Sequence, residues 1–486
     1  MVRQLRLVVL NDVYALDRET GVGRGGLAAA KTTINRLRDE APGDCLVVLA
    51  GDFFGGSSLA VQTQGEVVVD VLNEIDVDAV VLGNHEFDFG WQRLEYLIGK
   101  SKAKVWLGEN VRHDDGTLLE GVQGCKTFET SCGLKVGILG VCTRAVPTLS
   151  SPGEGVRFED PIPAAKKTCE RLREQGADIV IGLTHLGIAN DKELISAVPD
   201  IDFVIGGHDH DPIGIMYHDR FLFKCGQNAY WVGTVDVTMD ERNTPDLSWA
   251  MVSTNGVKED ARILDIIHAH QKQAQSGEDQ EWLDEVITKL LAPLDGRSNE
   301  IRRNEGSFGT LVADSIFEYF EKEGGRPDIA IINGGFIRGD KLYPAGTKLT
   351  RRHIFNEMPF PRVGVCAELA GEHLLMALEQ TLRFLPAASG SFPHFSDGVI
   401  VRVDASRPAL HRIVSMTLHG QDIVPTQTYR VCMTEFNLAG GDGVSGYSYG
   451  VQLNDVESIR IPEMTVRYLE SRSTVTPISP GRLQFV

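Results

Sequence analysis

The sequence predicts an α/β protein that is built from two domains. The chain has 486 residues, which is more than one hydrophobic core usually serves. Over the first 255 residues, short apolar strands alternate with amphipathic helices, and a second α/β unit begins near Ser307. Hydrophobic residues make up 42% of the chain and charged residues 24%, which is typical of a globular protein rather than a disordered one.

The first half of the chain has the pattern of a layered sheet. We expect apolar strands at 5–10, 45–50, 79–82, 179–183 and 203–205, and helices at 26–40 and 66–75. Between residues 221 and 254, apolar and polar residues alternate, which predicts three further strands. Helices followed by a β-rich stretch indicate a mixed sheet.

The middle of the chain is expected to be helical. Residues 258–292 carry apolar side chains at helical spacing and are polar on the other side. A further helix over 307–323 opens the second α/β unit. We therefore predict a first domain over 1–257, a helical linker over 258–300 and a smaller second domain over 301–486.

The charge and the apolar runs exclude several classes of partner. The formal net charge is −19, so the chain would repel a nucleic-acid polymer. No apolar run approaches the ~18 residues of a membrane span.

The first residues pass directly into a strand without a signal peptide. We therefore expect a cytoplasmic protein if the chain is complete, and a periplasmic or extracellular one if an export signal was trimmed. The oligomeric state stays open.

Five short polar motifs follow apolar strands of the first domain. They are Asn11-Asp12-Val13-Tyr14, Gly51-Asp52, Gly83-Asn84-His85-Glu86-Phe87-Asp88, Thr184-His185 and Gly207-His208-Asp209-His210. Ligand-binding residues of α/β sheets gather at the carboxyl ends of strands, so all five motifs can converge on one rim. Asp, Asn and His donors suit Mn, Fe, Zn or Co ions. Two ions about 3.5–4 Å apart need a bridging ligand, which the carboxylate of Asp52 can supply.

This ordered set resembles the signature of the calcineurin-like metallophosphoesterases, and the run GNHEFDFG is similar to the form found in their 5′-nucleotidase branch. The resemblance implies an α/β (α+β) protein with a four-layer αββα metallophosphoesterase sandwich, a linker helix and a smaller α/β substrate-binding domain. It also implies that His85 contacts the phosphoryl group and that Asp88 orients the His85 ring. The implied ligands are Asp12, Asp52 and His210 for metal one, and Asp52, Asn84, His185 and His208 for metal two.

Tyr14 departs from the family pattern, which carries His at this position. Three alternatives follow from this exchange. Tyr14 can ligate metal one as a phenolate, which would favour Fe³⁺. Metal one can instead be completed by water and bind weakly, or the site can hold a single metal. Asp209 and Asp211 flank the two histidines and are expected to face solvent or loops.

The second half carries a signature of its own. The segments Asn333-Gly334-Gly335-Phe336-Ile337-Arg338, Pro359-Phe360 and Phe436–Gly443 together resemble the 5′-nucleotidase C-terminal domain. Under this resemblance, Phe360 and Phe436 sandwich a planar base. The other predicted contacts are Asp442 to the ribose hydroxyls, Arg338 to a phosphate or carboxylate and Asn333 to the base. Arg303 lies one residue out of the expected register and is a candidate for phosphate binding.

We therefore expect a metal-dependent phosphatase that hydrolyses nucleoside 5′-phosphates to nucleoside and phosphate through a metal-bound hydroxide. The cofactors would be two divalent or trivalent ions, and the partner a small nucleotide. One alternative is a broader phosphomonoesterase or a 2′,3′-cyclic-nucleotide phosphodiesterase that uses the same site. An alternative of another class is a non-catalytic nucleotide-binding protein with a decayed metal site, which the Tyr14 exchange motivates.

Overall fold

The computed structural model describes residues 3–18, 23–239, 245–274, 280–360, 362–477 and 481–486. The chain divides into two compact units, residues 1–275 and 276–486, and each is described by itself below. No helix of the described residues is long and apolar enough to cross a membrane.

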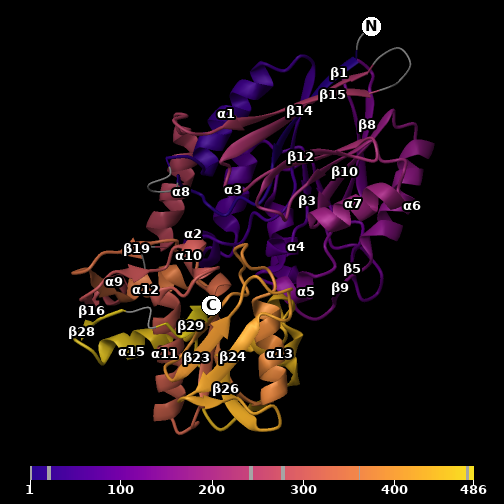
Figure 1. The fold of residues 1–486 in the computed structure, drawn as a ribbon. Coiled ribbons are helices and arrows are strands. Elements are labelled where there is room, and N and C mark those ends of the chain that lie inside the picture. The colour runs from indigo at the N-terminus through magenta and orange to yellow at the C-terminus, as the bar shows by residue number, and fades with distance from the viewer. Residues whose placement is uncertain (1–2, 19–22, 240–244, 275–279, 361, 478–480) are drawn as a thin grey trace. The chain divides into compact units, whose positions relative to one another are not determined.

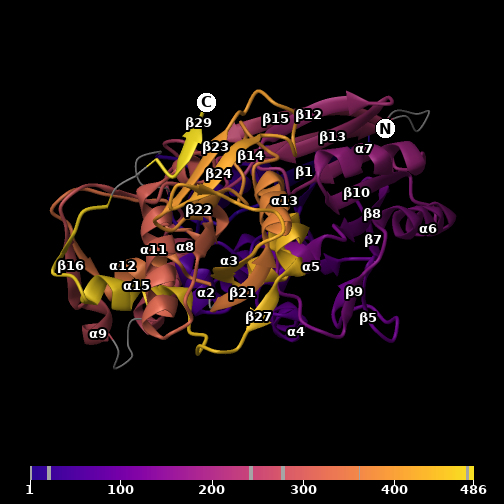
Figure 2. The ribbon, with the colours of Figure 1, turned by 60° about the horizontal axis from the view of Figure 1, so that its bottom comes forward.

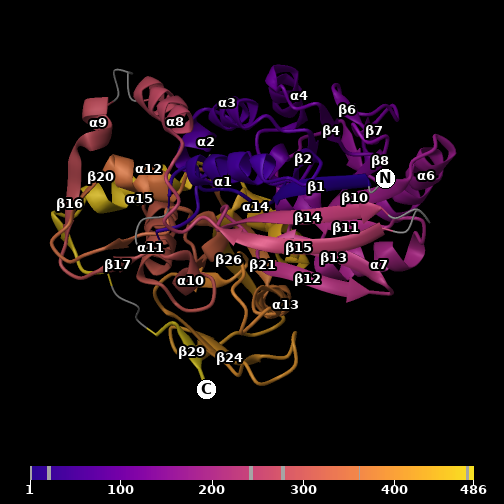
Figure 3. The same cartoon turned by 90° about the horizontal axis from the view of Figure 1, so that it is seen from above.

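Two stacked sheets form the centre of the first unit (Figure 1, Figure 3). The seven-stranded sheet has the order β15 (Pro245–Ser253), β14 (Trp231–Met239), β1 (Arg3–Leu10), β2 (Asp44–Leu49), β3 (Ala79–Val81), β4 (Val105–Leu107) and β6 (Val122–Gln123). The six-stranded sheet has the order β12 (Pro212–Tyr217), β13 (Arg220–Cys225), β11 (Phe203–Gly206), β10 (Ile179–His185), β8 (Lys135–Cys142) and β7 (Cys125–Glu129).

Helices cover the outer face of each sheet, so the predicted four-layer αββα order is confirmed. The seven-stranded sheet is covered by α1 (Leu27–Asp39), α3 (Glu66–Ile75) and α4 (Trp91–Lys100), and α8 (Ala261–Ala274) packs against α1 and α3. The six-stranded sheet is covered by α6 (Pro161–Glu174) and α7 (Ile188–Ala197). The side chains of β1 fit a strand that lies between a sheet and a helix layer. Leu7 and Val9 point to the other sheet, while Val8 and Leu10 point to the helices. A strand buried on both faces is a continuous apolar run.

The second unit is built around a five-stranded sheet (Figure 2). Its strand order is β22 (Pro393–Phe395), β18 (Ile329–Asn333), β26 (Thr428–Thr434), β21 (Gly364–Ala370) and β27 (Val451–Leu453). Helices α11 (Ser307–Lys322) and α15 (Ile461–Glu470) pack on one face. On the other face lie α13 (Gly371–Thr381) and a small sheet of β25 (Gln421–Asp422), β24 (Ile413–Leu418), β23 (Val399–Val403) and β29 (Leu483–Phe485).

The region expected to be a helical linker is only partly helical. Helices form at α8 and at α9 (Gln280–Asp284), but residues 286–290 are strand β16 (Val286–Leu290). Strand β16 pairs with β20 (Lys348–Thr350) and β28 (Thr474–Val475). The paired residues lie 59 or more positions apart in the sequence, so local periodicity did not reveal them. Helix α8 packs on α1 and α3 and therefore belongs to the first unit.

Candidate functional site

The predicted metal ligands lie on loops at one end of parallel strands in both sheets of the first unit. Strands β1, β2 and β3 run parallel, and so do β10 and β11. Their carboxyl ends carry the side chains of Asp12, Tyr14, Asp52, Asn84, His185, His208 and His210. Stacking the two sheets therefore brings together residues that are up to 198 positions apart in the sequence.

Three of these residues have a left-handed backbone. The φ angles are 52° at Asp12, 62° at Asp52 and 76° at His208. Non-glycine residues rarely adopt this conformation, and it is concentrated at functional sites, where the surrounding structure holds it. The sharp turn after each strand directs the three side chains back toward one another.

Four donors surround a position that we call metal site two. The distance from Asp52 Oδ2 to His185 Nε2 is 3.2 Å. His208 Nδ1 lies 3.3 Å from His185 Nε2 and 3.1 Å from Asn84 Oδ1. Ligand atoms that bind one ion at about 2.1 Å lie about 3.0–3.4 Å from one another. The four donors therefore fit the shell of a single ion.

A second group of four donors surrounds metal site one. The Tyr14 hydroxyl oxygen lies 3.0 Å from Asp52 Oδ2, 3.2 Å from Asp12 Oδ1 and 3.1 Å from His210 Nε2. Asp12 Oδ1 and His210 Nε2 are 3.6 Å apart. Because Asp52 Oδ2 belongs to both groups, it is placed to bridge two ions. The residues present therefore fit a dinuclear centre.

Buried charges perturb the pKa values of these ligands. Burial raises the pKa of Asp12 to about 7, against the opposing effect of His185. Burial of His185 is outweighed by the adjacent Asp52 carboxylate, which raises the pKa of the imidazole to about 10. Burial, reinforced by His185, lowers the pKa of His208 to about 4. Without metal, the protonated form of His185 is therefore favoured, and a bound cation would displace that proton.

Backbone partners hold the ligand side chains in place. His185 Nδ1 donates to the Ala50 carbonyl at 2.7 Å, which leaves Nε2 directed at Asp52. The Asn11 amide donates to Asp12 Oδ2 at 2.7 Å and to the Gly226 carbonyl at 2.6 Å. A Cβ at position 207 would lie 2.1 Å from the Ala50 carbonyl oxygen, so only glycine fits there.

Glu86 is a site residue that the sequence argument quoted but gave no role. Its carboxylate is buried and accepts from the backbone N–H groups of Gly83 at 2.6 Å, Phe53 at 2.7 Å and Asp52 at 2.9 Å. It thereby ties the loop after β2 to the loop after β3. Its place in the run GNHE was the available signal.

His85 lies beside the two metal sites with its ring oriented by Asp88. His85 Nδ1 donates to Asp88 Oδ2 at 2.8 Å, and the backbone N–H of His85 donates to Asp52 Oδ1 at 2.8 Å. Ser150, which the sequence argument missed, donates to Asp88 Oδ1 at 2.7 Å. This chain of hydrogen bonds fixes the ring and leaves Nε2 on its other side.

Lys224 is a second residue that the sequence argument missed. Its ammonium is fully buried and contacts the carboxylates of Asp209 at 2.6 Å and Asp191 at 2.7 Å. It also donates to the carbonyl oxygens of Leu186 at 2.6 Å and Gly207 at 2.7 Å. The expectation that Asp209 faces solvent or a loop is therefore wrong, because its carboxylate turns inward to the buried ammonium. A lone lysine inside the apolar run of β13 was the available signal.

In the second unit, Asn333 is the last residue of β18, and Asp442 lies in the 3-10 turn Gly441–Gly443, beyond the end of the parallel neighbour β26. The Asn333 amide donates to Asp442 Oδ2 at 2.8 Å and to the Gly390 carbonyl at 3.2 Å. Asp442 has a left-handed backbone with φ of 54°. Burial raises the pKa of the Asp442 carboxyl, while Arg338 and Asn333 oppose the shift.

Arginines, rather than a base-sized cavity, surround Asp442. Arg302 and Arg383 add to Arg338 in lowering the pKa of its carboxyl, and Arg383 donates to the Asp442 carbonyl at 2.7 Å. The candidate residue Arg303 is exposed, so the residue that reaches Asp442 electrostatically is its neighbour Arg302. These three arginines outnumber the one carboxylate that they act on, and this excess of positive charge suits an anion.

The two predicted stacking rings each carry an arginine over the face. The Arg338 guanidinium lies 5.0 Å from the Phe360 ring centroid, and that of Arg362 lies 4.7 Å from the Phe436 centroid. Phe360 is buried in the core of the second unit, whereas Phe436 is half-buried. Phe436 therefore offers the more accessible of the two rings.

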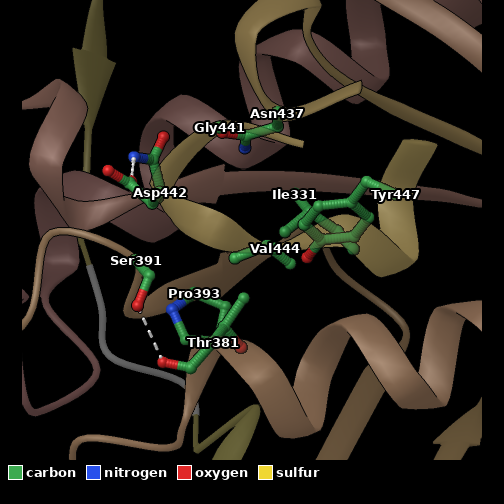
Figure 4. A pocket seen from close by; sticks show the side chains of 10 residues that line it. Ile331, Thr381, Ser391, Pro393, Asn437, Gly441, Asp442, Val444 and Tyr447 are labelled. Carbon is green, nitrogen blue, oxygen red and sulfur yellow. Dashed lines mark hydrogen bonds between the residues drawn. The ribbon is translucent and has the colours of Figure 1, made fainter. Parts of the chain in front are cut away.

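A small cavity lies beside Asp442 (Figure 4). Its volume is about 10 Å³, and its lining includes Asn437, Ser391 and Tyr447. This volume matches about one water molecule and is far below that of a ligand pocket. The buried Tyr447 hydroxyl borders it and has no hydrogen-bond partner among the described residues. The cavity therefore belongs to the support of the Asp442 loop rather than to a substrate pocket.

Two family models match this chain. The calcineurin-like phosphoesterase model matches residues 5–212, and the model of the 5′-nucleotidase C-terminal domain matches residues 286–448. The first match contains all the predicted metal ligands, and the second contains all the predicted substrate-binding residues.

Similar proteins and structures agree with this division. A trifunctional nucleotide phosphoesterase of Bacillus subtilis is 26% identical over 94% of this chain, although the chain spans only 34% of that relative's length. A 5′-nucleotidase of Diplobatis ommata is 25% identical to this chain, and the match covers 99% of this chain and 90% of the Diplobatis protein. The crystal structure of a 5′-nucleotidase precursor from Thermus thermophilus matches this chain with a TM-score of 0.84 and 24% identity. The match covers 100% of this chain and 99% of the Thermus chain, so the two share a fold.

Proposed function

Because the chain belongs to the 5′-nucleotidase family of metallophosphoesterases, we propose that it hydrolyses nucleoside 5′-phosphates to a nucleoside and inorganic phosphate. The observation that carries the proposal is the pair of donor shells that share Asp52, with His85 beside them. A family fold alone would not specify the chemistry, whereas two adjacent ion positions suit in-line displacement at phosphorus.

The metal centre would be held entirely by residues of the first unit. Site one would use Asp12, Tyr14, Asp52 and His210, and site two would use Asp52, Asn84, His185 and His208. When bound, the ions supply Lewis-acid polarisation of the phosphoryl oxygens and activation of water. The chain contributes a preorganised geometry, since hydrogen bonds from buried groups already hold the donor side chains.

His85 would act directly on the phosphoryl group. Its Nδ1 is bonded to Asp88, so Nε2 is the nitrogen that would contact a substrate oxygen. A protonated Nε2 can stabilise charge that develops on the phosphoryl oxygens and can protonate the leaving oxygen of the ribose. Asp88, held by Ser150, keeps the ring in that orientation.

Residues of the second unit would recognise the rest of the nucleotide. We assign the base to the rings of Phe436 and Phe360, the ribose hydroxyls to Asp442, and an anionic group to Arg338. Arg302 replaces Arg303 as the further candidate for anion binding, because it acts on Asp442 electrostatically. Asn333 would position Asp442 rather than contact the base directly.

Phosphate release from a panel of substrates tests the proposal. The panel contains 5′-AMP, a 2′,3′-cyclic nucleotide and glycerol phosphate, each assayed with added Mn²⁺ and then with chelator. We expect chelator-sensitive release that favours 5′-AMP. His85→Ala should lower kcat by about 10²-fold or more, and the exposed-site control His411→Ala should leave it unchanged.

Other outcomes would assign a different activity. Equal release from glycerol phosphate would contradict nucleotide specificity, and preferred release from the cyclic nucleotide would make the chain a phosphodiesterase. Nucleotide binding without release from any substrate would favour a non-catalytic binding protein.

A further inference from the structure

The Tyr14 hydroxyl oxygen lies among three atoms that can each bind a metal ion. Within 3.2 Å of this oxygen lie Asp52 Oδ2, Asp12 Oδ1 and His210 Nε2. Two of these neighbours are buried carboxylates, and a cation between them would offset the cost of burying their charge. The distances of 3.0–3.2 Å match the spacing of neighbouring ligands around one ion, whereas an oxygen at the ion's own position would lie about 2.1 Å from each donor.

Packing fixes the Tyr14 oxygen at this position. The Tyr14 backbone N–H donates to Asn228 Oδ1 at 3.1 Å. Gly56 packs directly under the side chain, where a Cβ would come within 2.6 Å of the Tyr14 Cβ. The ring stands edge-on to His85 and His210, with centroids 5.3 Å and 5.4 Å away. The ring therefore has little freedom to withdraw from the ligand group.

The two metal sites differ in the charge of their donors. Site one has three groups that bind as anions, namely Asp12, Asp52 and Tyr14, together with one imidazole. Site two has three groups that bind as neutral donors, Asn84, His185 and His208, and only the Asp52 carboxylate, which it shares. Anionic oxygen donors favour hard cations of high charge, whereas imidazole-rich sites suit divalent transition metals. A trivalent ion would neutralise the three anionic donors of site one.

We propose that Tyr14 is a ligand of metal one and makes that site selective for a trivalent ion, ferric iron, while site two takes a divalent ion. This inference rests on the proposed function only in requiring a metal at Asp12, Asp52 and His210. On binding of Fe³⁺, the phenolic O–H bond breaks, the iron–oxygen bond forms and the proton passes to solvent. The iron enters as Fe³⁺ and keeps that oxidation state, so the step needs no oxidant or reductant.

Visible absorption spectroscopy tests the proposal without any assay of activity. Metal-free protein would be titrated with ferric nitrilotriacetate and then with Zn²⁺. We expect a visible charge-transfer band from the iron–phenolate bond, saturating at one Fe³⁺ per chain. Tyr14→Phe and Tyr14→His should both lose the band, and Tyr14→His should still take up Zn²⁺ at both sites. The control Tyr96→Phe, altered at an exposed position on α4, should keep the band at full intensity.

The outcomes separate this inference from the proposed function. Absence of a band in the wild-type protein, or a band that survives in Tyr14→Phe, would overturn Tyr14 ligation. A Tyr14-dependent band in a protein that releases no phosphate would support ligation and contradict the phosphatase activity. Phosphate release from a protein that shows no Tyr14-dependent band after loading with Fe³⁺ would do the reverse.

Discussion

Removing the buried charge of Lys224 should destabilise the first unit strongly. The substitution Lys224→Met preserves much of the side-chain volume but removes an ammonium that contacts four oxygens at 2.6–2.7 Å. It leaves Asp191, which is fully buried, without its cationic partner. Breaking one half of a buried ion pair costs about 3–5 kcal/mol, because the remaining charge stays desolvated.

Urea unfolding followed by tryptophan fluorescence measures this loss. Four of the five tryptophans lie in the first unit, so the signal reports mainly on that unit. With a slope of about 2–3 kcal/mol/M, the midpoint should fall by about 1–2 M. The exposed control Lys167→Met should change the free energy of unfolding by less than about 0.5 kcal/mol.

A double-mutant cycle separates the lost pairing from lost packing. In Lys224→Met/Asp191→Asn both buried charges are gone, so the double variant should be more stable than the sum of the two single losses predicts, by about 1–3 kcal/mol. Strict additivity of the two single losses, or a Lys224→Met midpoint equal to that of the exposed control, would refute the reasoning.

Three further predictions follow from the buried contacts. Burial raises the pKa of Glu357 to about 7, although the hydrogen bond from Tyr343 opposes this shift, so the folded state favours the protonated carboxyl. The free energy of unfolding should therefore fall by up to about 3 kcal/mol as the pH rises from about 4 to 8. Urea unfolding followed by circular dichroism should show that this free energy depends less on pH in Glu357→Gln. Ser150→Ala removes the donor to Asp88 and should lower kcat for 5′-AMP about tenfold at unchanged KM, whereas a change confined to KM would contradict a positioning role. Gly207→Ala would place a Cβ 2.8 Å from His185 Nδ1 and should weaken metal binding in a calorimetric titration, while Gly99→Ala, which meets no neighbour, should leave it unchanged.

The fold and the clustering of the predicted metal ligands were accessible from the sequence for a simple reason. Each ligand follows an apolar strand, and parallel strands end at one edge, so the strand pattern already implies that Asp12, Asp52 and His208 gather on one rim. The linker prediction failed at Val286–Leu290 because pairing with distant strands overrode local periodicity.

The support of the site was not accessible in the same way. The left-handed backbones at Asp12, Asp52 and His208 depend on the whole loop environment rather than on residue type. Lys224 and Ser150 reach the site from other strands and loops, through contacts over 15 and 62 residues. Arg302 and Arg303 are adjacent in the sequence, and only their burial distinguishes the one that acts on Asp442.

The central claim is that two ions share Asp52 and that both are needed to cleave a nucleoside 5′-phosphate. Its most direct test is phosphate release from 5′-AMP measured against metal content per chain, determined by mass spectrometry, during stepwise loading of metal-free protein. We predict that release rises steeply only as the content passes from one to two ions per chain, and that Asp52→Asn abolishes both full loading and release while Asp211→Asn, altered at an exposed position, changes neither. Full activity at one ion per chain, or in Asp52→Asn, would contradict the account.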